Sequence, residues 1–276
     1  MNDKFNHPLV DLVGYFDRIN YAGDRSATTA ALNALHRGHA MHIPFENVDV
    51  LLGRPIQLDV ESLQAKLVRG RRGGYCFEQN ALFAAVLEAL GFRLTRLATR
   101  VRFGATGVRP RSHMNLLVEV DGSPWLADVG FGGDGLLEPL PLVEGRESRQ
   151  AVWTYRLMRE DDSWVLQSRR GDGWFDLYSS TLEPQYSVDY EVSNYFTATH
   201  PDSIFRKMLT AQRTTPEARY VLRNRTFTVE RAGEVSERTL KSDDELLGVL
   251  AETFGLEFLP GTRFPLPADK PEDGRS

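Results

Sequence analysis

The strongest constraint on this chain is the stretch RRGGYCFEQN at residues 71–80, which contains its only cysteine, Cys76. The two adjacent glycines before the cysteine favour a tight, left-handed bend. Residues 80–91 are apolar on nearly every side and end at Gly91, which predicts a buried helix. Cys76 is therefore expected at a helix N-terminus or one turn before it, where the helix dipole and free N–H groups stabilise a thiolate. A lone cysteine can equally be a small buried apolar side chain, and the stretch alone leaves both interpretations open.

Composition narrows the class of protein. With 276 residues and 41% hydrophobic content, the chain can bury a sizeable core in one large domain or in two to three small ones. A net charge of −5 gives no reason to expect a nucleic acid or an anionic membrane as a partner. A single cysteine forbids an internal disulfide and favours the reducing cytoplasm. Residues 1–8 lack the apolar core of a secretion signal, and no apolar run approaches the roughly 18 residues of a membrane span.

The first ninety residues have the spacing of helices. Apolar residues at helical intervals predict helices over 9–19, from about 26 to 43, and over 60–68, where Asp59 is the expected cap. After residue 91 the period changes from 3.6 to 2. Leu97, Thr99, Val101 and Phe103 alternate with Arg96, Ala98, Arg100 and Arg102, which predicts a half-buried strand.

Three histidines, His36, His39 and His42, lie three residues apart on the second predicted helix. Each step of three rotates a helical side chain by about 300°, so the outer two point about 120° apart and do not easily share one metal ion. We therefore expect solvated histidines near a helix end rather than a zinc site.

A hairpin is predicted at residues 121–122, where Asp-Gly separates the apolar runs 113–120 and 123–129. Pairing that begins directly beside this turn gives partner numbers that sum to 243. His113 then becomes the diagonal neighbour of Asp128, at a distance that a histidine-to-carboxylate hydrogen bond can span. A one-residue shift, caused by the proline next to the turn, would instead put the two side chains on opposite faces.

Cys76, His113 and Asp128 are the residue types that a thiol nucleophile requires. The thiol needs a base, and the base needs an acceptor that fixes its tautomer and stabilises its positive form. A hairpin with only a structural role is the alternative. Asp128 leads into the glycine-rich stretch 129–135, whose N–H groups could approach a phosphate or a carbonyl. This stretch matches neither a dinucleotide fingerprint nor a phosphate-binding loop.

Several motifs in order along the chain resemble the arylamine N-acetyltransferase family. They are RGGYCFEQN at 72–80, Ser-His at 112–113 and DVGFG at 128–132, with the supporting pieces GYFDRI at 14–19, IPFEN at 43–47 and TATHP at 197–201. The resemblance covers most of the chain, and no triad position departs from the family pattern.

The resemblance implies an α+β fold in three parts with a papain- or transglutaminase-like Cys-His-Asp core. The parts are a helical bundle over 1–92 that carries the nucleophile, a β-barrel over 93–200 that carries the histidine and aspartate, and an α/β lid with a proline-rich tail over 201–276. The local pattern agrees with strands at 153–157, 164–168, 174–178, 219–222, 226–231 and 235–241, and with helices at 203–212 and from the capping box at 242–245 to Gly255.

The resemblance also implies the chemistry, a ping-pong transfer of acetyl from acetyl-CoA through a Cys76 thioester to an arylamine, hydrazine or N-hydroxyarylamine. No metal is implied. By the same resemblance Phe45 and Phe131 are expected to contact the arylamine, although aromatic side chains also serve ordinary core packing. The residues expected to border the CoA channel are Val101, Phe103, Gly130, Gly132 and Phe205.

Other functions use the same three residues. A thiol hydrolase or a transglutaminase-like enzyme would share the triad and differ from an acetyltransferase only in whether water or an amine takes the acyl group. An amide synthase would use the triad to close a macrocycle from a carrier-bound acyl chain. A non-catalytic CoA- or drug-binding module is disfavoured because all three triad positions are intact. We expect a cytoplasmic enzyme of xenobiotic metabolism with small-molecule partners only. Its acceptor amine, acyl-chain preference and oligomeric state, with a homodimer as one option, stay open.

Overall fold

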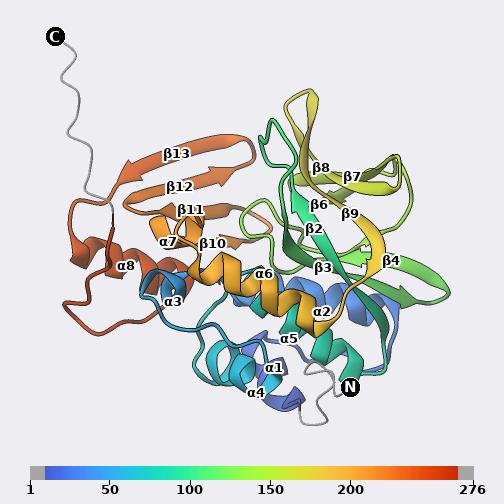
Figure 1. Cartoon of the computed structure of the whole chain (residues 1–276), viewed down its shortest axis with the longest axis horizontal. Helices are drawn as coiled ribbons and strands as arrows, with labels where there is room; N and C mark the ends of the chain where they lie inside the picture. The colour runs from blue at the N-terminus through green and yellow to red at the C-terminus, as the bar shows by residue number, and fades with distance from the viewer. Residues whose placement is uncertain (1–9, 267–276) are drawn as a thin grey trace.

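The computed structural model describes residues 10–266 of the chain. Two sheets lie next to each other, and the N-terminal helices gather along one side of them (Figure 1). Residues 1–8, on which the expectation about a secretion signal rests, lie outside the described residues, as does residue 9 of the first predicted helix. Within residues 10–266, no helix has both the length and the apolar character needed to cross a membrane.

Residues 10–90 are mostly helical, as predicted. Their elements are α1 (Leu12–Arg18), α2 (Thr29–His42), β1 (Phe45–Glu46), α3 (Val48–Leu51), α4 (Val60–Leu63), a π-helical turn η1 (Gln64–Arg69) and α5 (Cys76–Ala89). Asp11, Thr28 and Asp59 each accept a hydrogen bond from the first turn of α1, α2 and α4, which supplies one of the free N–H groups there with a partner. Every side chain from Cys76 to Leu87 is buried, so α5 is the central helix of the core.

The bend before α5 differs from the prediction. Arg71 has a positive φ of 50°, whereas Gly73 and Gly74 do not have the left-handed conformation that their sequence suggested. These two glycines instead allow a close approach: a Cβ on Gly73 would lie 2.1 Å from the carbonyl oxygen of Pro44. Gly74 forms an isolated bridge with Phe45 at this point. The glycines therefore let the segment before the cysteine lie directly against the start of β1.

The histidines of α2 also differ from the prediction. His36 and His39 have no exposed surface, and only His42 is half-buried. The rings of the first two contact Phe83 of α5 at centroid distances of 5.7 and 5.5 Å. Their burial is tolerated because ring nitrogens of both find hydrogen-bond partners inside the protein. The expectation of solvated histidines is wrong for these two.

The larger sheet has eight antiparallel strands in the order β5-β4-β3-β2-β9-β8-β7-β6 and forms a nearly closed barrel, with β5 and β6 as its edges. Its strands are β2 (Arg93–Val101), β3 (Arg111–Val120), β4 (Ser123–Ala127), β5 (Leu140–Pro141), β6 (Ser148–Gln150), β7 (Trp153–Glu160), β8 (Ser163–Arg170) and β9 (Gly173–Pro184). The hairpin of β3 and β4 pairs Val120 with Ser123 and Leu116 with Ala127. The predicted register, in which partner numbers sum to 243, is confirmed.

The smaller sheet has the order β1-β10-β11-β12-β13. Its later strands are β10 (Thr210–Thr214), β11 (Arg219–Arg223), β12 (Thr226–Arg231) and β13 (Glu234–Thr239), and the helices of this region are α6 (Ser187–Thr199), α7 (Ile204–Lys207) and α8 (Asp243–Phe254). The predicted helix over 203–212 is wrong at its C-terminal end. Residues 210–212 there belong to strand β10, which pairs with β1. The predicted start of α8 is confirmed, with Ser242 as an N-cap that accepts from the Glu245 N–H, and Gly255 at a φ of 67° ends the helix. The capping box itself is incomplete, because the Glu245 carboxylate accepts from the Lys241 N–H rather than from that of Ser242.

The parts of the chain are interleaved in space. β1 comes from the helical region but belongs to the sheet that is otherwise C-terminal, and the core around α5 includes Met114 and Leu116 of β3 and Tyr190 of α6. The division at residues 92 and 200 therefore stays a prediction.

Candidate active site

Cys76 is the first residue of α5 and is buried, with 4% of its surface exposed. The helix forms here because Tyr75 before it is extended and Glu78, three residues on, accepts a hydrogen bond from the Tyr75 N–H. The free N–H groups of this first turn make the position favourable for a negative charge. The Cys76 Sγ lies 3.7 Å from the carbonyl oxygen of Ser112, which immediately precedes His113.

His113 and Asp128 meet as the hairpin register predicts. His113 is on β3, Asp128 follows the last residue of β4, and Nε2 of the histidine lies 2.6 Å from Oδ2 of the aspartate. Both side chains are almost completely buried. His113 also forms a hydrogen bond with the side chain of Cys76, and since its Nε2 faces Asp128, the nitrogen that faces the thiol is Nδ1.

The charges of this pair support each other. Burial alone would lower the pKa of His113, but the neighbouring Asp128 carboxylate outweighs that effect and raises it to about 10. Burial alone would raise the pKa of Asp128, but the His113 charge and the hydrogen bonds to the carboxylate lower it. At neutral pH the site therefore holds an imidazolium between a carboxylate and the cysteine.

Asn80 is a site residue that the sequence motifs did not single out. It lies one turn after Cys76 on α5, and its Nδ2 donates to Asp128 Oδ1 at 2.9 Å and to the Met114 carbonyl at 2.7 Å. Its own oxygen accepts the Val129 N–H. The available signal was the polar run Glu78, Gln79 and Asn80 at the start of a mostly apolar helix, because such groups must find partners when they are buried.

Gly130 brings the glycine-rich loop against the start of α5. A Cβ at this position would lie 2.8 Å from Cys76 Cα, which leaves no room for any other residue. The Gly130 N–H also donates to Asp128 Oδ1 at 3.0 Å. Gly132, next in the loop, has a φ of 91° and would meet Gln212 with a side chain. The loop thus needs glycine for close contact at one position and for backbone conformation at the other.

The aromatic residues named from the sequence lie in two pairs. Phe131 contacts the His113 ring at 5.3 Å and Phe103 at 6.4 Å. Phe45 contacts Phe205 at 5.9 Å. Phe103 is partly exposed, whereas Phe45 is buried.

Val101, the last residue of β2, pairs with Tyr178 of β9, whose ring lies 5.3 Å from that of His113. Val101 is itself half-buried. Val101 therefore lies on the barrel strand beside Tyr178, one of the rings that pack against His113.

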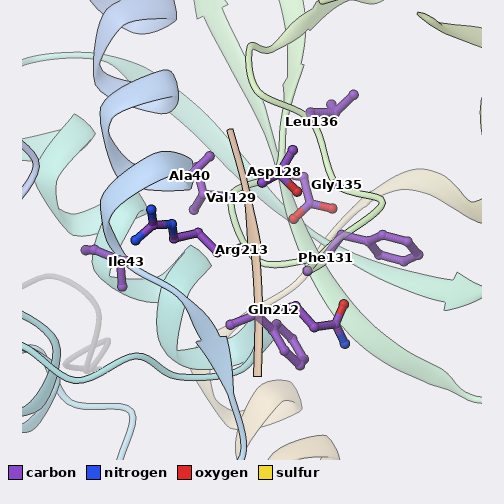
Figure 2. A pocket seen from close by; sticks show the side chains of 12 residues that line it. Ala40, Ile43, Asp128, Val129, Phe131, Gly135, Leu136, Gln212 and Arg213 are labelled. Carbon is purple, nitrogen blue, oxygen red and sulfur yellow. The ribbon is translucent and has the colours of Figure 1, made fainter. Parts of the chain in front are cut away.

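A small cavity lies beside the site, between α2, the glycine-rich loop and β10 (Figure 2). Its volume is about 20 Å³, room for about one water molecule. Phe45, Phe131 and Asp128 line it, and Gln212 and Arg213 lie along its β10 side. No three His, Cys, Asp or Glu side chains in residues 10–266 gather in a way that could hold a metal ion.

Comparison with known proteins places the chain in a family. A family model described as N-acetyltransferase matches residues 28–260. The arylamine N-acetyltransferase of Escherichia coli is 43% identical over 245 residues, which cover 88% of this chain and 87% of that protein. The chain belongs to the arylamine N-acetyltransferase family. As a member of that family it is an acyltransferase.

Other members of the arylamine N-acetyltransferase family agree in sequence and in fold. The Salmonella typhimurium protein named arylamine N-acetyltransferase / N-hydroxyarylamine O-acetyltransferase is 40% identical over 89% of this chain and 88% of its own length. The solved structure of Mycobacterium marinum arylamine N-acetyltransferase in complex with CoA is 38% identical, with a TM-score of 0.85 over 89% of this chain and 93% of that one. The fold expected from the family resemblance is confirmed at the level of an α+β architecture.

Proposed function

We propose that this member of the arylamine N-acetyltransferase family moves an acetyl group from acetyl-CoA to arylamines, hydrazines or N-hydroxyarylamines through a thioester on Cys76. The observation that carries the proposal is the buried series Cys76, His113 and Asp128 at the start of α5. Relatives named arylamine N-acetyltransferases support an arylamine as the acceptor. The solved complex of one relative with CoA supports acetyl-CoA as the donor.

In the first half-reaction the Cys76 thiolate attacks the acetyl carbonyl of acetyl-CoA and forms a new S–C bond. The S–C bond to CoA breaks, and the His113 imidazolium gives its proton to the departing CoA thiolate. Asp128 holds the ring throughout, so that Nδ1 faces the reacting sulfur. The products are free CoA and an S-acetyl cysteine.

In the second half-reaction the neutral amine attacks the thioester carbonyl. His113, now neutral, takes the proton that the amine loses, and the S–C bond to Cys76 breaks. The acetamide leaves, and the site returns to a thiolate beside an imidazolium.

The binding residues are proposed by position. Phe45 and Phe131 would contact the ring of the arylamine, as the family resemblance implies, and the Phe131 ring lies against that of His113. An aromatic acceptor packs well against such rings, edge to face or offset.

Acetyl-CoA would approach along the residues that the family resemblance names. They are Val101, Phe103, Gly130, Gly132 and Phe205. We further propose a cytoplasmic location, because the chain has a single cysteine, and the three-part division at residues 92 and 200.

Turnover assays separate this function from its alternatives. The protein is mixed with acetyl-CoA, and CoA release is followed without an acceptor, with a panel of arylamines and hydrazines, and with lysine-containing peptides. The proposal predicts slow release alone and rapid release with acetylated product when an arylamine is present. Rapid release without an amine would instead indicate a hydrolase, and acetylation of the peptides alone would indicate a transglutaminase-like enzyme. An amide synthase would leave every acceptor in the panel unmodified.

A further inference from the structure

His36 is a completely buried histidine that contacts both ends of the glycine-rich loop. It lies on α2, far from Asp128 in sequence, and its Nε2 accepts a hydrogen bond from the Asp128 N–H at 3.1 Å. Its Nδ1 lies 3.0 Å from the carbonyl oxygen of Leu137. One ring therefore joins Asp128, the first residue after β4, to Leu137, which follows the glycine-rich stretch 129–135 and precedes β5.

These two contacts define one tautomer. The Asp128 N–H can only donate, so Nε2 must be without a proton, and Nδ1 must then carry the proton that it donates to Leu137. Only the neutral ring satisfies both partners. Burial lowers the pKa of His36 to about 4, in keeping with a neutral ring at physiological pH.

The position of Asp128 is thus held from two directions. Asn80 of α5 holds its carboxylate at Oδ1, and His36 of α2 holds its backbone N–H from the other side. The same loop carries Phe131, which lies against the His113 ring. Movement of the loop ends would shift both the carboxylate that His113 needs and the aromatic ring beside it.

We propose that His36 is a positioning residue for acetyl transfer, which fixes the loop 128–137 so that the Asp128 carboxylate meets His113. This inference rests on the proposed role of Asp128 in the reaction. His36 itself contacts none of the reacting atoms of that proposal. It acts through the backbone of Asp128 and through the tautomer that its own two hydrogen bonds impose.

A purely structural role is the alternative, and the chain contains a matched control for it. His39 lies one turn further on α2, is also completely buried and contacts the same ring of Phe83. Burial lowers its pKa as well, to about 3. Its Nδ1 is bonded to the Tyr15 hydroxyl rather than to the loop. Replacing His39 therefore disturbs the same packing without touching Asp128.

The test uses three substitutions at His36 and two at His39. His36→Gln offers an oxygen that can still accept from Asp128, His36→Asn offers an N–H that can still donate to Leu137, and His36→Phe removes both bonds. His39→Gln and His39→Phe are the controls. For each folded variant we would measure thermal stability, the rate at which Cys76 acetylates with acetyl-CoA, and the pH dependence of Cys76 alkylation by iodoacetamide.

We expect His36→Phe to slow acetylation by about 10²-fold, the loss that a misplacement of about 1 Å can cause. The pH profile of its Cys76 alkylation should shift toward that of an Asp128→Asn variant, in which the carboxylate beside His113 is lost. His36→Gln should recover much of the rate and His36→Asn less. The His39 variants should change stability but neither the rate nor the profile.

Wild-type rates and profiles in both His36→Phe and His36→Asn would overturn the inference, as would equal losses in the His36 and His39 variants. A wild-type protein that forms no acetyl-Cys76 would overturn the proposed function instead. The alkylation profiles need no acetyl donor, so they would still report whether His36 governs the surroundings of the thiol.

Discussion

The charge on His113 depends on one carboxylate. Asp128 raises the pKa of His113 to about 10, well above the reference value of about 6.5. Because its pKa is raised, the His113 group contributes fully to stability below about pH 6.5 and loses that contribution as the pH rises through about 10, whereas Asp128, whose pKa is lowered, loses its contribution in acid. Between pH 6 and 9 the imidazolium persists, and the thiol of Cys76 has a cation beside it.

Asp128→Asn should remove this charge while keeping the shape of the side chain. His113 would then lose its proton near neutral pH, and the amide can favour the wrong tautomer. In the serine-protease triad such a change cost on the order of 10⁴ in rate, and we expect a similar or smaller loss of acetylation here. The pH dependence of Cys76 alkylation by iodoacetamide should therefore differ between the folded variant and the wild type, and measuring it beside the acetylation rate checks this expectation.

The competing view of Asp128 is that it only supports the turn into the Gly130 loop. A folded Asp128→Asn protein that is less heat-stable, yet acetylates and alkylates as the wild type does, would favour that view.

Sequence reasoning reached the pair His113 and Asp128 through local rules but not the residues that support it. The Asp-Gly turn sets the register of β3 and β4, so the contact between His113 and Asp128 could be derived. His36 and Asn80 contact Asp128 across 92 and 48 residues of chain, and nothing in local spacing encodes those contacts. The aromatic and CoA-channel residues came from the family resemblance alone.

Among the elements, those with local signals were predicted best. The N-cap Ser242 and Gly255 determine both ends of α8. Helix α6 was not predicted, because it is rich in β-branched and aromatic residues of modest helix propensity. Strand β10 was mistaken for helix because its burial depends on pairing with β1, more than 160 residues earlier.

Gly73→Ala tests why glycine is needed before α5. The new Cβ would meet backbone atoms of Pro44, so the two segments must move apart, and overpacking of this kind costs about 1–3 kcal/mol. Urea unfolding should show that loss, and acetylation should slow as Cys76 shifts.

Gly248→Ala is the matched control, because it lies inside α8 with nothing within 4 Å of the added Cβ. It should stabilise the protein by about 0.5–1 kcal/mol, the helix-propensity difference between the two residues. A Gly73→Ala protein as stable as the wild type would contradict the close-approach argument.

At the scale of the whole molecule, Arg219 joins the two sheets. It lies on β11, is almost fully buried, and donates to the Tyr155 hydroxyl of β7 at 2.8 Å and to Asp134 of the glycine-rich loop at 3.2 Å. Its guanidinium also lies 3.6 Å from the centre of the Trp153 ring. The contact brings together residues up to 85 positions apart.

Arg219→Met should keep the volume and remove the bonds. Hydrogen bonds to charged groups contribute about 1.5–3 kcal/mol each to stability, so we expect a loss in that range by urea unfolding. Arg223→Met, at the exposed end of the same strand, should change stability by less than about 0.5 kcal/mol. Equal effects of the two substitutions would show that Arg219 does not join the sheets.

The most direct test of the central claim is the mass of the protein after mixing with acetyl-CoA and no amine. We predict one added acetyl group, about 42 Da, as a covalent acyl intermediate requires, and peptide mapping should place it on Cys76. Addition of an arylamine should remove the acetyl group and yield the acetamide, and Cys76→Ser should acquire none under the same conditions. Full turnover by a folded Cys76→Ser protein, or an acetyl group found only elsewhere in the chain, would contradict the account.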